Sequence, residues 1–198
     1  LDICGFSTFL VARVPRVCCG EHGVKTVAVP WSAPHSRFTL AFEAFVIAVL
    51  KSTMVQSKAA ALVGVSESQI HDMMHRAVRR GMERRRREES EQPLEHLSLD
   101  EKSFRKGHHY ITVLGDSQRC RVLDVIEDRT ASATMDLLKQ SLTESQRRTV
   151  LSVTMDMWAA FRSAKNKVLP GAVLVHDRFH VAKYLNEAID KSRRMEQR

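Results

Sequence analysis

The stretch His96-Leu97-Ser98-Leu99-Asp100 predicts a short β-strand that ends on a carboxylate, and two later stretches repeat this arrangement. Residues 150–156 are rich in β-forming side chains and end on Asp156, and residues 172–177 end on Asp177. In an open α/β sheet, the carboxyl ends of parallel strands meet at one edge, where binding sites form. The sequence therefore predicts an acidic site at one edge of an α/β sheet.

The segments around these strands complete the pattern. Two further β-rich runs follow the first strand, with a turn over residues 115–118 between them, and predict an antiparallel meander of three strands. In chain order, the expected elements are strands over 96–100, 110–114 and 121–126, a helix over 131–142, a strand over 150–156, a helix over 159–168, a strand over 172–177 and a helix over 181–194. This order, βββαβαβα with acids closing the first, fourth and fifth strands, is that of a ribonuclease-H-like domain. We expect such an α/β domain over residues 97–198.

The carboxylates that end the first and fourth strands are candidate metal ligands. If these strands are neighbours, Asp100 and Asp156 lie close together, and two carboxylates at close range repel unless a cation lies between them. Hard oxygen ligands favour Mg²⁺ or Mn²⁺, and two such ions about 4 Å apart can hold the attacking and leaving oxygens of a phosphoryl displacement. Solvated strand ends are the alternative, and the spacing alone does not decide between them. Asp177 is a candidate auxiliary ligand or a structural group near the site.

Residues 36–90 have a different, helical character. An apolar stripe at three- and four-residue spacing predicts an amphipathic helix; its members are Phe38, Phe42, Phe45, Val46 and Val49. A short Ala-rich helix then ends at Gly64, and Ser66 with Gln69 predicts a capping box for the next helix. A helix, a tight glycine turn and a capped helix are the plan of a helix-turn-helix, to which an ordinary αα-hairpin is the alternative. The candidate DNA-contacting side chains near the turn are Ser66, Ser68 and Gln69.

Basic residues are in excess. The chain has 31 Lys and Arg against 23 Asp and Glu, a net charge of +8, which favours a polyanionic partner, double-stranded DNA before a membrane surface. Cations at a helix end also favour its dipole, but seven arginines exceed what a dipole needs. We therefore expect phosphate contacts at Arg76, Arg79, Arg80, Arg84, Arg85, Arg86 and Arg87. Other cations beside the acidic strand ends are expected to hold DNA phosphates, or else to pair with the carboxylates; these are Lys102, Arg105, Lys106 and Arg178.

The remaining segments carry weaker signals. Residues 1–35 are predicted to form short strands and turns, with β-rich runs over 9–12 and 24–29, and residues 91–96 are the expected linker to the α/β domain. The four cysteines have no disulfide-framework spacing, and we expect neither a secretory signal nor a membrane span. A cytoplasmic protein is therefore the expectation.

Longer motifs carry a family resemblance. They are Leu-Asp-Glu-Lys-Ser-Phe-Arg-Lys-Gly-His over residues 99–108, Thr-Met-Asp-Met-Trp over 154–158, Asp-Arg-Phe-His-Val over 177–181, and residues 12–24 and 76–82. In order, and over nearly the whole chain, they resemble the insertion-sequence transposases of the ISL-three family. The resemblance implies a zinc-binding N-terminus, a helix-turn-helix and a DDE catalytic domain of ribonuclease-H-like fold. It also implies that Asp100 and Asp156 are the first two catalytic acids and that the enzyme uses two divalent metal ions. In the implied reaction, water attacks the DNA strand at the element's end, and the freed 3′-hydroxyl then attacks target DNA.

The chain departs from the family in two places. The family's zinc finger combines a Cys-x-x-Cys pair with a Cys-x-x-His pair, and only the second is present, as Cys19-Gly-Glu-His22. Zinc takes four ligands in a structural site, and Cys4 and Cys18 are poor substitutes. We therefore expect a free thiol and a surface histidine here, with Cys19 and His22 as Zn²⁺ ligands only in a longer N-terminus. The family's third acid, a Glu on a later helix, has no counterpart, so we expect a chain truncated at both ends.

The expected function is therefore a metal-dependent DNA transposase, incomplete as given. The alternatives are a catalytically inactive DNA-binding remnant or regulator, and a host nuclease or resolvase of the same fold that cuts DNA without joining it. A homo-oligomer on DNA is expected only by analogy with enzymes of this chemistry.

Overall fold

The structure is a computed structural model that describes residues 8–34, 36–105 and 109–197. The chain folds into two compact units, Leu1–Arg84 and Arg85–Arg198, and each is described by itself. The boundary between them lies inside a helix, whereas the sequence predicted a linker over residues 91–96. Part of that segment packs into the second unit, where Leu94 is 4% exposed and belongs to the core.

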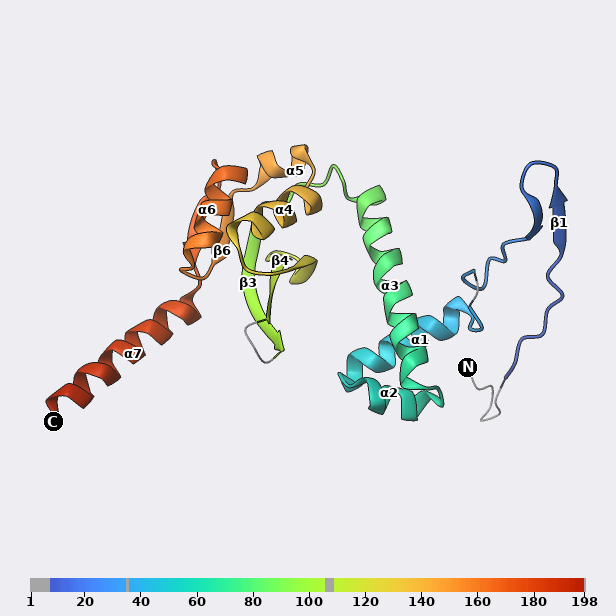
Figure 1. Ribbon diagram of the computed structural model, residues 1–198, viewed down its shortest axis with the longest axis horizontal. Helices are drawn as coiled ribbons and strands as arrows, with labels where there is room; N and C mark the ends of the chain where they lie inside the picture. Colours follow the sequence, from blue (N-terminus) through green and yellow to red (C-terminus); the bar gives the residue numbers. More distant parts are fainter. Residues whose placement is uncertain (1–7, 35, 106–108, 198) are drawn as a thin grey trace. The chain divides into compact units, whose positions relative to one another are not determined.

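Three helices form the body of the first unit (Figure 1). They are α1 (Leu40–Thr53), α2 (Gln56–Val63) and α3 (Glu67–Glu88), and the last turn of α3 lies beyond the unit's boundary. Helix α2 ends at Gly64, whose φ of 69° lies in the left-handed region that favours glycine. The predicted capping box is confirmed: the Ser66 N–H donates to Gln69 Oε1 at 2.9 Å, and the Gln69 N–H donates to Ser66 Oγ at 3.3 Å.

A small apolar core holds these helices together. Val46 of α1, Ala59 of α2, and Ile70 and Met73 of α3 are fully buried, and Val46 belongs to the stripe predicted for α1. Phe45 is 44% exposed, so its place in the α1 stripe was predicted wrongly. A one-residue step rotates a side chain by about 100° around a helix, and Val46 occupies the core position.

A buried ion pair supplements this core. Glu43 of α1 is completely buried, and the Arg76 Nη2 atom lies 2.7 Å from its Oε1 atom. The Arg80 Nη2 atom lies 2.9 Å from the second oxygen, and the Ser36 hydroxyl lies 3.1 Å from the first. A buried carboxylate needs such partners because its desolvation is costly. The pair therefore ties α1 to α3.

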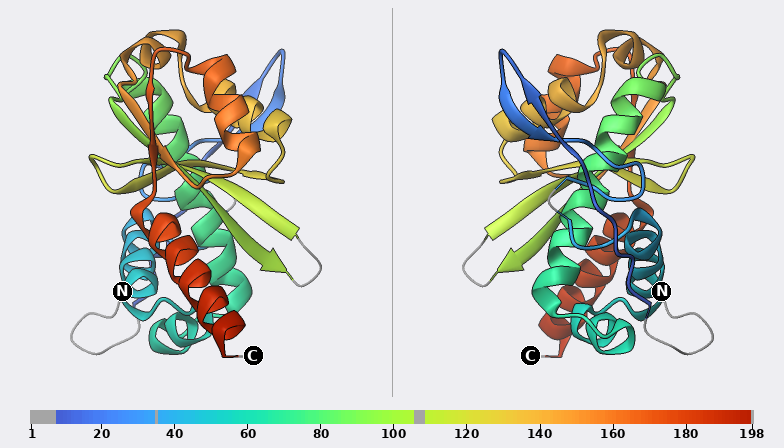
Figure 2. Two further views of the ribbon diagram at one scale, coloured as in Figure 1. Left: turned by 90° about the vertical axis from the view of Figure 1, so that its left-hand side faces the viewer. Right: turned by 90° about the vertical axis from the view of Figure 1, so that its right-hand side faces the viewer.

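The N-terminal part of this unit contains one hairpin, formed by β1 (Arg16–Cys19) and β2 (Gly23–Thr26) and drawn in blue in Figure 2. Strand β2 covers half of the β-rich run predicted over 24–29. The strand predicted over 9–12 is wrong, because residues 8–15 form no regular structure. Phe9 is 85% and Val11 is 92% exposed, so these β-forming side chains have no apolar surface to pack on.

The second unit is built on a mixed five-stranded sheet of order β5-β4-β3-β6-β7. The strands are β3 (His96–Arg105), β4 (His109–Asp116), β5 (Arg121–Glu127), β6 (Ser152–Met155) and β7 (Val173–His176). The predicted meander is confirmed, since β3, β4 and β5 pair antiparallel in sequence. Strand β6 pairs parallel with β3 and with β7. The first and fourth strands are therefore neighbours, as the metal-site hypothesis required.

Four helices accompany the sheet: α4 (Ala131–Ser141), α5 (Glu144–Thr149), α6 (Ala159–Val168) and α7 (Arg178–Glu196). Leu137 of α4 and Phe161 of α6 share one core with Leu97, Leu99 and Met155 of the sheet. Side chains alternate along a strand, so these two helices cover the face to which Leu97 and Leu99 point. None of the residues of α7 is buried.

Helix α5 was not predicted from the sequence. Thr143 and Gln146 form a capping box that starts it, and their spacing is the signal that could have revealed it. Helix α7 begins at Arg178, three residues before the predicted start, because the Asp177 carboxylate accepts a hydrogen bond from the Phe179 N–H at 2.9 Å. Within the described part of the chain, no helix is both long and apolar enough to cross a membrane.

A network of charged side chains lies at the end of the sheet where β3 begins and β4 ends. The Asp116 side chain is 2% exposed, and the Arg119 and Arg121 guanidinium groups lie 3.1 and 3.4 Å from its Oδ2 atom. Burial alone raises the pKa of Asp116, but hydrogen bonds from Arg119 and the two positive charges outweigh it and leave that pKa below its usual value. The hydrogen bond from Arg121 lowers the pKa of Glu89. Both carboxylates therefore stabilise the folded unit when they are ionised.

We expect Glu43→Gln to destabilise the first unit. The substitution removes the charge that both arginines neutralise, and because their guanidinium groups keep part of their surface in water, we expect a loss of about 2 kcal/mol. Thermal and urea unfolding followed by circular dichroism would measure it. Glu83→Gln, at an exposed position of α3, is the control; equal stability of the two variants would contradict a structural role for the pair.

We expect the second unit to lose stability in acid. A lowered pKa contributes stability above the ordinary carboxyl value, about 4, and that contribution is lost as the pH falls below it. Arg121→Gln should therefore make the free energy of unfolding less dependent on pH between about 5 and 3. Urea unfolding monitored by Trp158 fluorescence, with Trp31 replaced by Phe, would measure it. Arg148→Gln removes an exposed ion pair and should leave the pH profile unchanged.

Candidate functional site

Three aspartates come directly after residues that pair with one another across the three parallel strands. In the register of β3, β6 and β7, Leu99 pairs with Met155, and Met155 pairs with His176. The next residue along each strand is an aspartate: Asp100, Asp156 and Asp177. The sheet therefore brings the three predicted acidic residues to the same edge, although they lie far apart in sequence.

Asp100 and Asp156 differ in how the backbone holds them. Asp100 is still inside β3, where it pairs with Val113 of β4, and its side chain is exposed. Its Oδ1 atom accepts a hydrogen bond from the Glu101 N–H at 2.8 Å. Asp156 lies one residue beyond β6, in the loop before α6, and its Oδ1 atom accepts from the Met157 N–H. The position of Asp156 therefore depends on contacts of that loop.

His180 joins two of the carboxylates. Its Nδ1 atom lies 3.4 Å from Asp156 Oδ1, and its Nε2 atom lies 3.9 Å from Asp177 Oδ2. The first turn of α7 places His180 three residues after Asp177, on the same side of the helix. Sequence reasoning assigned His180 no role, since nothing in the spacing shows that it lies beside Asp156.

The donors fit a hard divalent cation, because carboxylate oxygens are what Mg²⁺ and Mn²⁺ prefer. The set is nevertheless incomplete: among residues 8–34, 36–105 and 109–197, no group of three or more His, Cys, Asp or Glu side chains is arranged to hold a metal ion. Asp100 and Asp156 are therefore candidate ligands only, and His180 lies between the Asp156 and Asp177 carboxylates.

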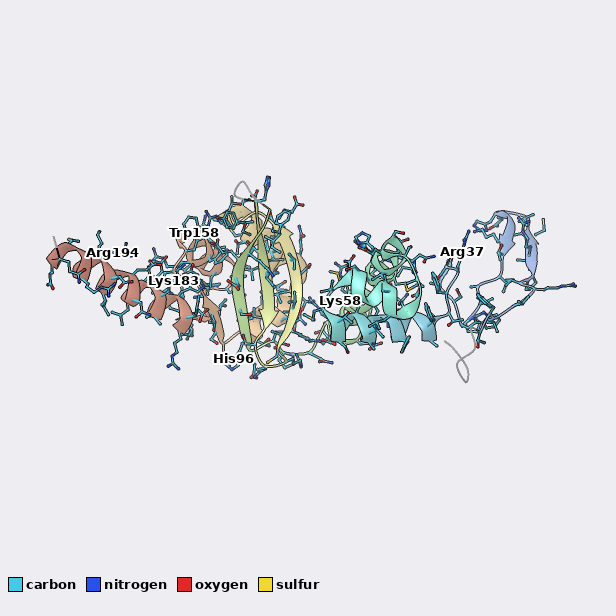
Figure 3. All side chains as sticks on the ribbon, turned by 90° about the horizontal axis from the view of Figure 1, so that it is seen from below. Arg37, Lys58, His96, Trp158, Lys183 and Arg194 are labelled. Carbon is cyan, nitrogen blue, oxygen red and sulfur yellow. The ribbon has the colours of Figure 1, made fainter. Side chains whose placement is uncertain are left out.

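Next to these acids, Arg129 lies between two aromatic rings. Its Cζ atom is 3.9 Å from the ring centroid of Tyr110 and 4.7 Å from that of Trp158. Its Nη1 atom donates to both Glu101 oxygens, at 3.0 and 3.2 Å. Figure 3 shows Trp158 and His96 at opposite ends of the sheet, so this cluster belongs to the carboxyl end of β3. The sequence did not indicate Arg129.

The cations predicted beside the acids are only partly described. Lys102 is exposed on β3, two residues after Asp100 and therefore on the same face of the strand. Arg178 is exposed at the start of α7. The Arg105 side chain and Lys106 lie outside what the structure describes.

The seven arginines of α3 divide into two groups. Arg76 and Arg80 pair with Glu43. Arg85 donates to the carbonyl oxygens of Leu123 and Ser141, and burial lowers the pKa of its guanidinium. These three arginines are committed to internal contacts. The exposed members are Arg79, Arg84, Arg86 and Arg87.

Near the turn, the capping box occupies two of the residues predicted to contact DNA. Ser66 and Gln69 bond to each other's backbone, and the Ser68 hydroxyl lies 2.9 Å from that of Ser66. One and two turns further along α3, His71 and His75 are exposed, with their Nε2 atoms 3.0 Å apart. The exposed polar side chains of α3 therefore include two histidines that the sequence pattern did not indicate.

The Cys19-x-x-His22 pair lies in the β1–β2 hairpin, and Cys19 is a free thiol. The Cys19 Sγ atom lies 3.4 Å from His22 Nδ1. Cys18 is exposed beside it, and Cys4 lies outside the described residues. These are two side chains of the kinds that bind zinc, whereas a structural zinc site takes four ligands.

Comparisons with known proteins agree over both units. Residues 97–198 match a family model of ISL3-type DDE transposases, described as "Transposase", and residues 27–78 match the "Helix-turn-helix domain of transposase family ISL3". Over 98% of its length, the chain is 27% identical to the "Transposase for insertion sequence element IS1557" of two Mycobacterium tuberculosis strains. Over 50% of its length, it is 34% identical to the "Transposase for insertion sequence element IS1001" of Bordetella parapertussis.

The match to these relatives is partial in length. The chain spans 43% of the Mycobacterium proteins and 25% of the Bordetella protein. Among solved structures, a simian T-cell lymphotropic virus intasome in complex with PP2A regulatory subunit B56 gamma matches 67% of this chain and 51% of its own, at 13% identity and a TM-score of 0.31, a similarity too low to carry an argument.

Proposed function

Because this chain belongs to the ISL3 family of transposases, we propose that it is the DNA-binding and partial catalytic portion of an enzyme that cleaves DNA at the ends of an insertion sequence and joins them to target DNA. One observation carries the catalytic part of the proposal. Asp100 lies in β3 and Asp156 directly follows the adjacent parallel strand β6, each one residue beyond the paired Leu99 and Met155, inside the segment that matches the transposase family.

The catalytic fold that we propose is ribonuclease-H-like. In chain order, the strands of the sheet are arranged third, second, first, fourth, fifth, and only the second is antiparallel to the others. The predicted order of helices and strands agrees with the observed one apart from α5. This topology supports the assignment and explains why the first and fourth strands carry the two acids.

In this mechanism, Asp100 and Asp156 would hold divalent cations, Mg²⁺ or Mn²⁺. When bound, such ions lower the pKa of an attacking water and neutralise charge on the phosphoryl oxygens. Lys102, on the same face of β3 as Asp100, and Arg178, beside Asp177, neutralise the DNA phosphates that approach the acids. His180 and the Met157 N–H hold the Asp156 carboxylate in one orientation.

The DNA-binding part of the proposal rests on α2, the Gly64 turn and α3. A second helix of this kind inserts its amino-terminal half into the major groove, so Ser68, His71 and His75 are the side chains that we propose to meet base edges. The four exposed arginines further along α3, Arg79, Arg84, Arg86 and Arg87, would contact phosphates. We propose double-stranded element ends and target DNA as the partners, with a second copy of the protein on the other element end.

We propose zinc binding only for a protein with a longer N-terminal segment than this chain. Cys19 and His22 would supply two ligands, and a further pair would have to come from elsewhere to complete a tetrahedral site.

We expect Asp100→Asn and Asp156→Asn each to weaken Mn²⁺ binding by more than about tenfold, because each removes a charged ligand. Binding of the same variants to element-end DNA should change less than about twofold. Electron paramagnetic resonance of free Mn²⁺ and fluorescence anisotropy of labelled DNA would measure the two quantities. In a full-length transposase that contains this chain, the same substitutions should abolish strand transfer.

Asp136→Asn, at an exposed position on α4, is the matched control for charge. If DNA binding fell together with metal binding, the two acids would be structural and the catalytic assignment would fail. If the chain binds DNA but neither substitution changes Mn²⁺ binding, a DNA-binding remnant would be favoured. If DNA is cleaved but not joined, a nuclease would be favoured.

We expect replacement of Arg79, Arg84, Arg86 and Arg87 by Gln to reduce the salt dependence of DNA binding. The slope of log K against log salt should become shallower by about 0.9 for each phosphate that the variant no longer neutralises. A control with Gln at four exposed arginines outside α3, namely Arg148, Arg162, Arg193 and Arg194, makes the same change in net charge. Equal slopes for the two quadruple variants would refute phosphate binding by α3.

A further inference from the structure

We propose that Arg129 is a positioning residue, which acts through Trp158 and Glu101 to fix the separation of the Asp100 and Asp156 carboxylates. The inference rests on the proposed function, because it concerns the same acids. It adds a residue outside the acidic motifs, in the loop between β5 and α4.

The two acids differ in what holds them. Asp100 lies inside β3, and its neighbour Glu101 pairs with Thr112 in the same antiparallel ladder. The backbone hydrogen bonds of the sheet therefore fix that side of the site. Asp156 lies beyond the last paired residue of β6, and no ladder reaches it. The separation of the two carboxylates depends on how the loop that begins at Asp156 is attached to the sheet.

Arg129 makes that attachment. The Trp158 Nε1–H, two residues after Asp156, donates to the Arg129 carbonyl at 3.2 Å, and the Trp158 ring faces the Arg129 guanidinium at 4.7 Å. On its other side, the guanidinium stacks on Tyr110 of β4 at 3.9 Å and donates to Glu101 of β3. A planar guanidinium can stack and form directed hydrogen bonds at once, which an ammonium cannot.

The exposure of these groups indicates that the cluster is not part of the hydrophobic core. The Arg129 side chain is 32% exposed, the Glu101 side chain is 21% exposed and Trp158 is 43% exposed. The core residues Leu97, Leu99 and Met155 are almost fully buried and belong to an apolar cluster that does not include Arg129, Glu101 or Trp158. Loss of Arg129 should therefore release the Asp156 loop while the sheet and its core remain folded.

The test measures Mn²⁺ binding to the whole chain by electron paramagnetic resonance, with thermal unfolding as a check on the fold. Arg129→Gln should raise the dissociation constant of Mn²⁺ about tenfold, the size typical of residues that orient metal ligands. Arg129→Lys keeps the charge opposite Glu101 but not the planar stack, and should recover only part of the affinity. Arg162→Gln, exposed on α6, is the matched control and should bind Mn²⁺ like the parent chain.

A second variant and a second measurement protect the test from a folding defect. Trp158→Phe keeps an aromatic ring but removes the N–H that reaches Arg129, and should weaken Mn²⁺ binding in the same direction by a smaller factor. With Trp31 replaced by Phe, the fluorescence anisotropy of Trp158 should fall in Arg129→Gln, because the ring loses its stacking partner.

The outcomes separate this inference from the proposed function. If Asp156→Asn leaves Mn²⁺ binding unchanged, the proposed metal site itself is wrong. If Asp156→Asn abolishes binding while folded Arg129→Gln and Trp158→Phe bind Mn²⁺ as tightly as the parent chain, the site stands and the role of Arg129 is refuted.

Discussion

The register of three parallel strands is the constraint on which the candidate site depends. Leu99, Met155 and His176 pair in one row, and the aspartate after each is carried to the same edge of the sheet. A shift of one residue in either pairing would move an acid to the opposite face. The register is held by the core, because Leu97, Leu99, Val153 and Met155 all bury their side chains under α4 and α6. Burial of apolar side chains thus fixes the position of charged ones.

On helix α3, the structure separates cations that stabilise the fold from cations that are exposed to a partner. A count of arginines treats all seven on α3 alike. Arg76 and Arg80 neutralise the buried Glu43, and Arg85 satisfies two carbonyl oxygens. The remaining four are exposed, so the positive surface offered to DNA is smaller than the composition suggests. For Arg76 and Arg80, this division follows from one buried carboxylate on α1, which the sequence gives no reason to pair with residues 33 and 37 positions later.

Most elements were predictable because their signals are local. Strand composition, the Gly64 turn and the Ser66–Gln69 capping box each lie within a few residues, and the structure agrees with them. The errors have physical causes of their own. Among the described residues, no strand pairs with residues 9–12. Helix α5 was overlooked because its six residues have no apolar periodicity, and a capping box is the signal that indicates it. The boundary between the units fell inside α3, since residues after Arg85 pack with the sheet.

The sequence by itself determined the type and order of the elements, the family, and the choice of Asp100, Asp156 and Asp177 as acids at strand ends, because these follow from local composition and motif. Only the tertiary structure decided which strands are neighbours and which side chains meet. His180 beside Asp156, and Arg129 between Tyr110 and Trp158, join residues 19 to 29 positions apart. Such contacts arise from the packing of strands and loops around a shared core, and no spacing along the chain encodes them.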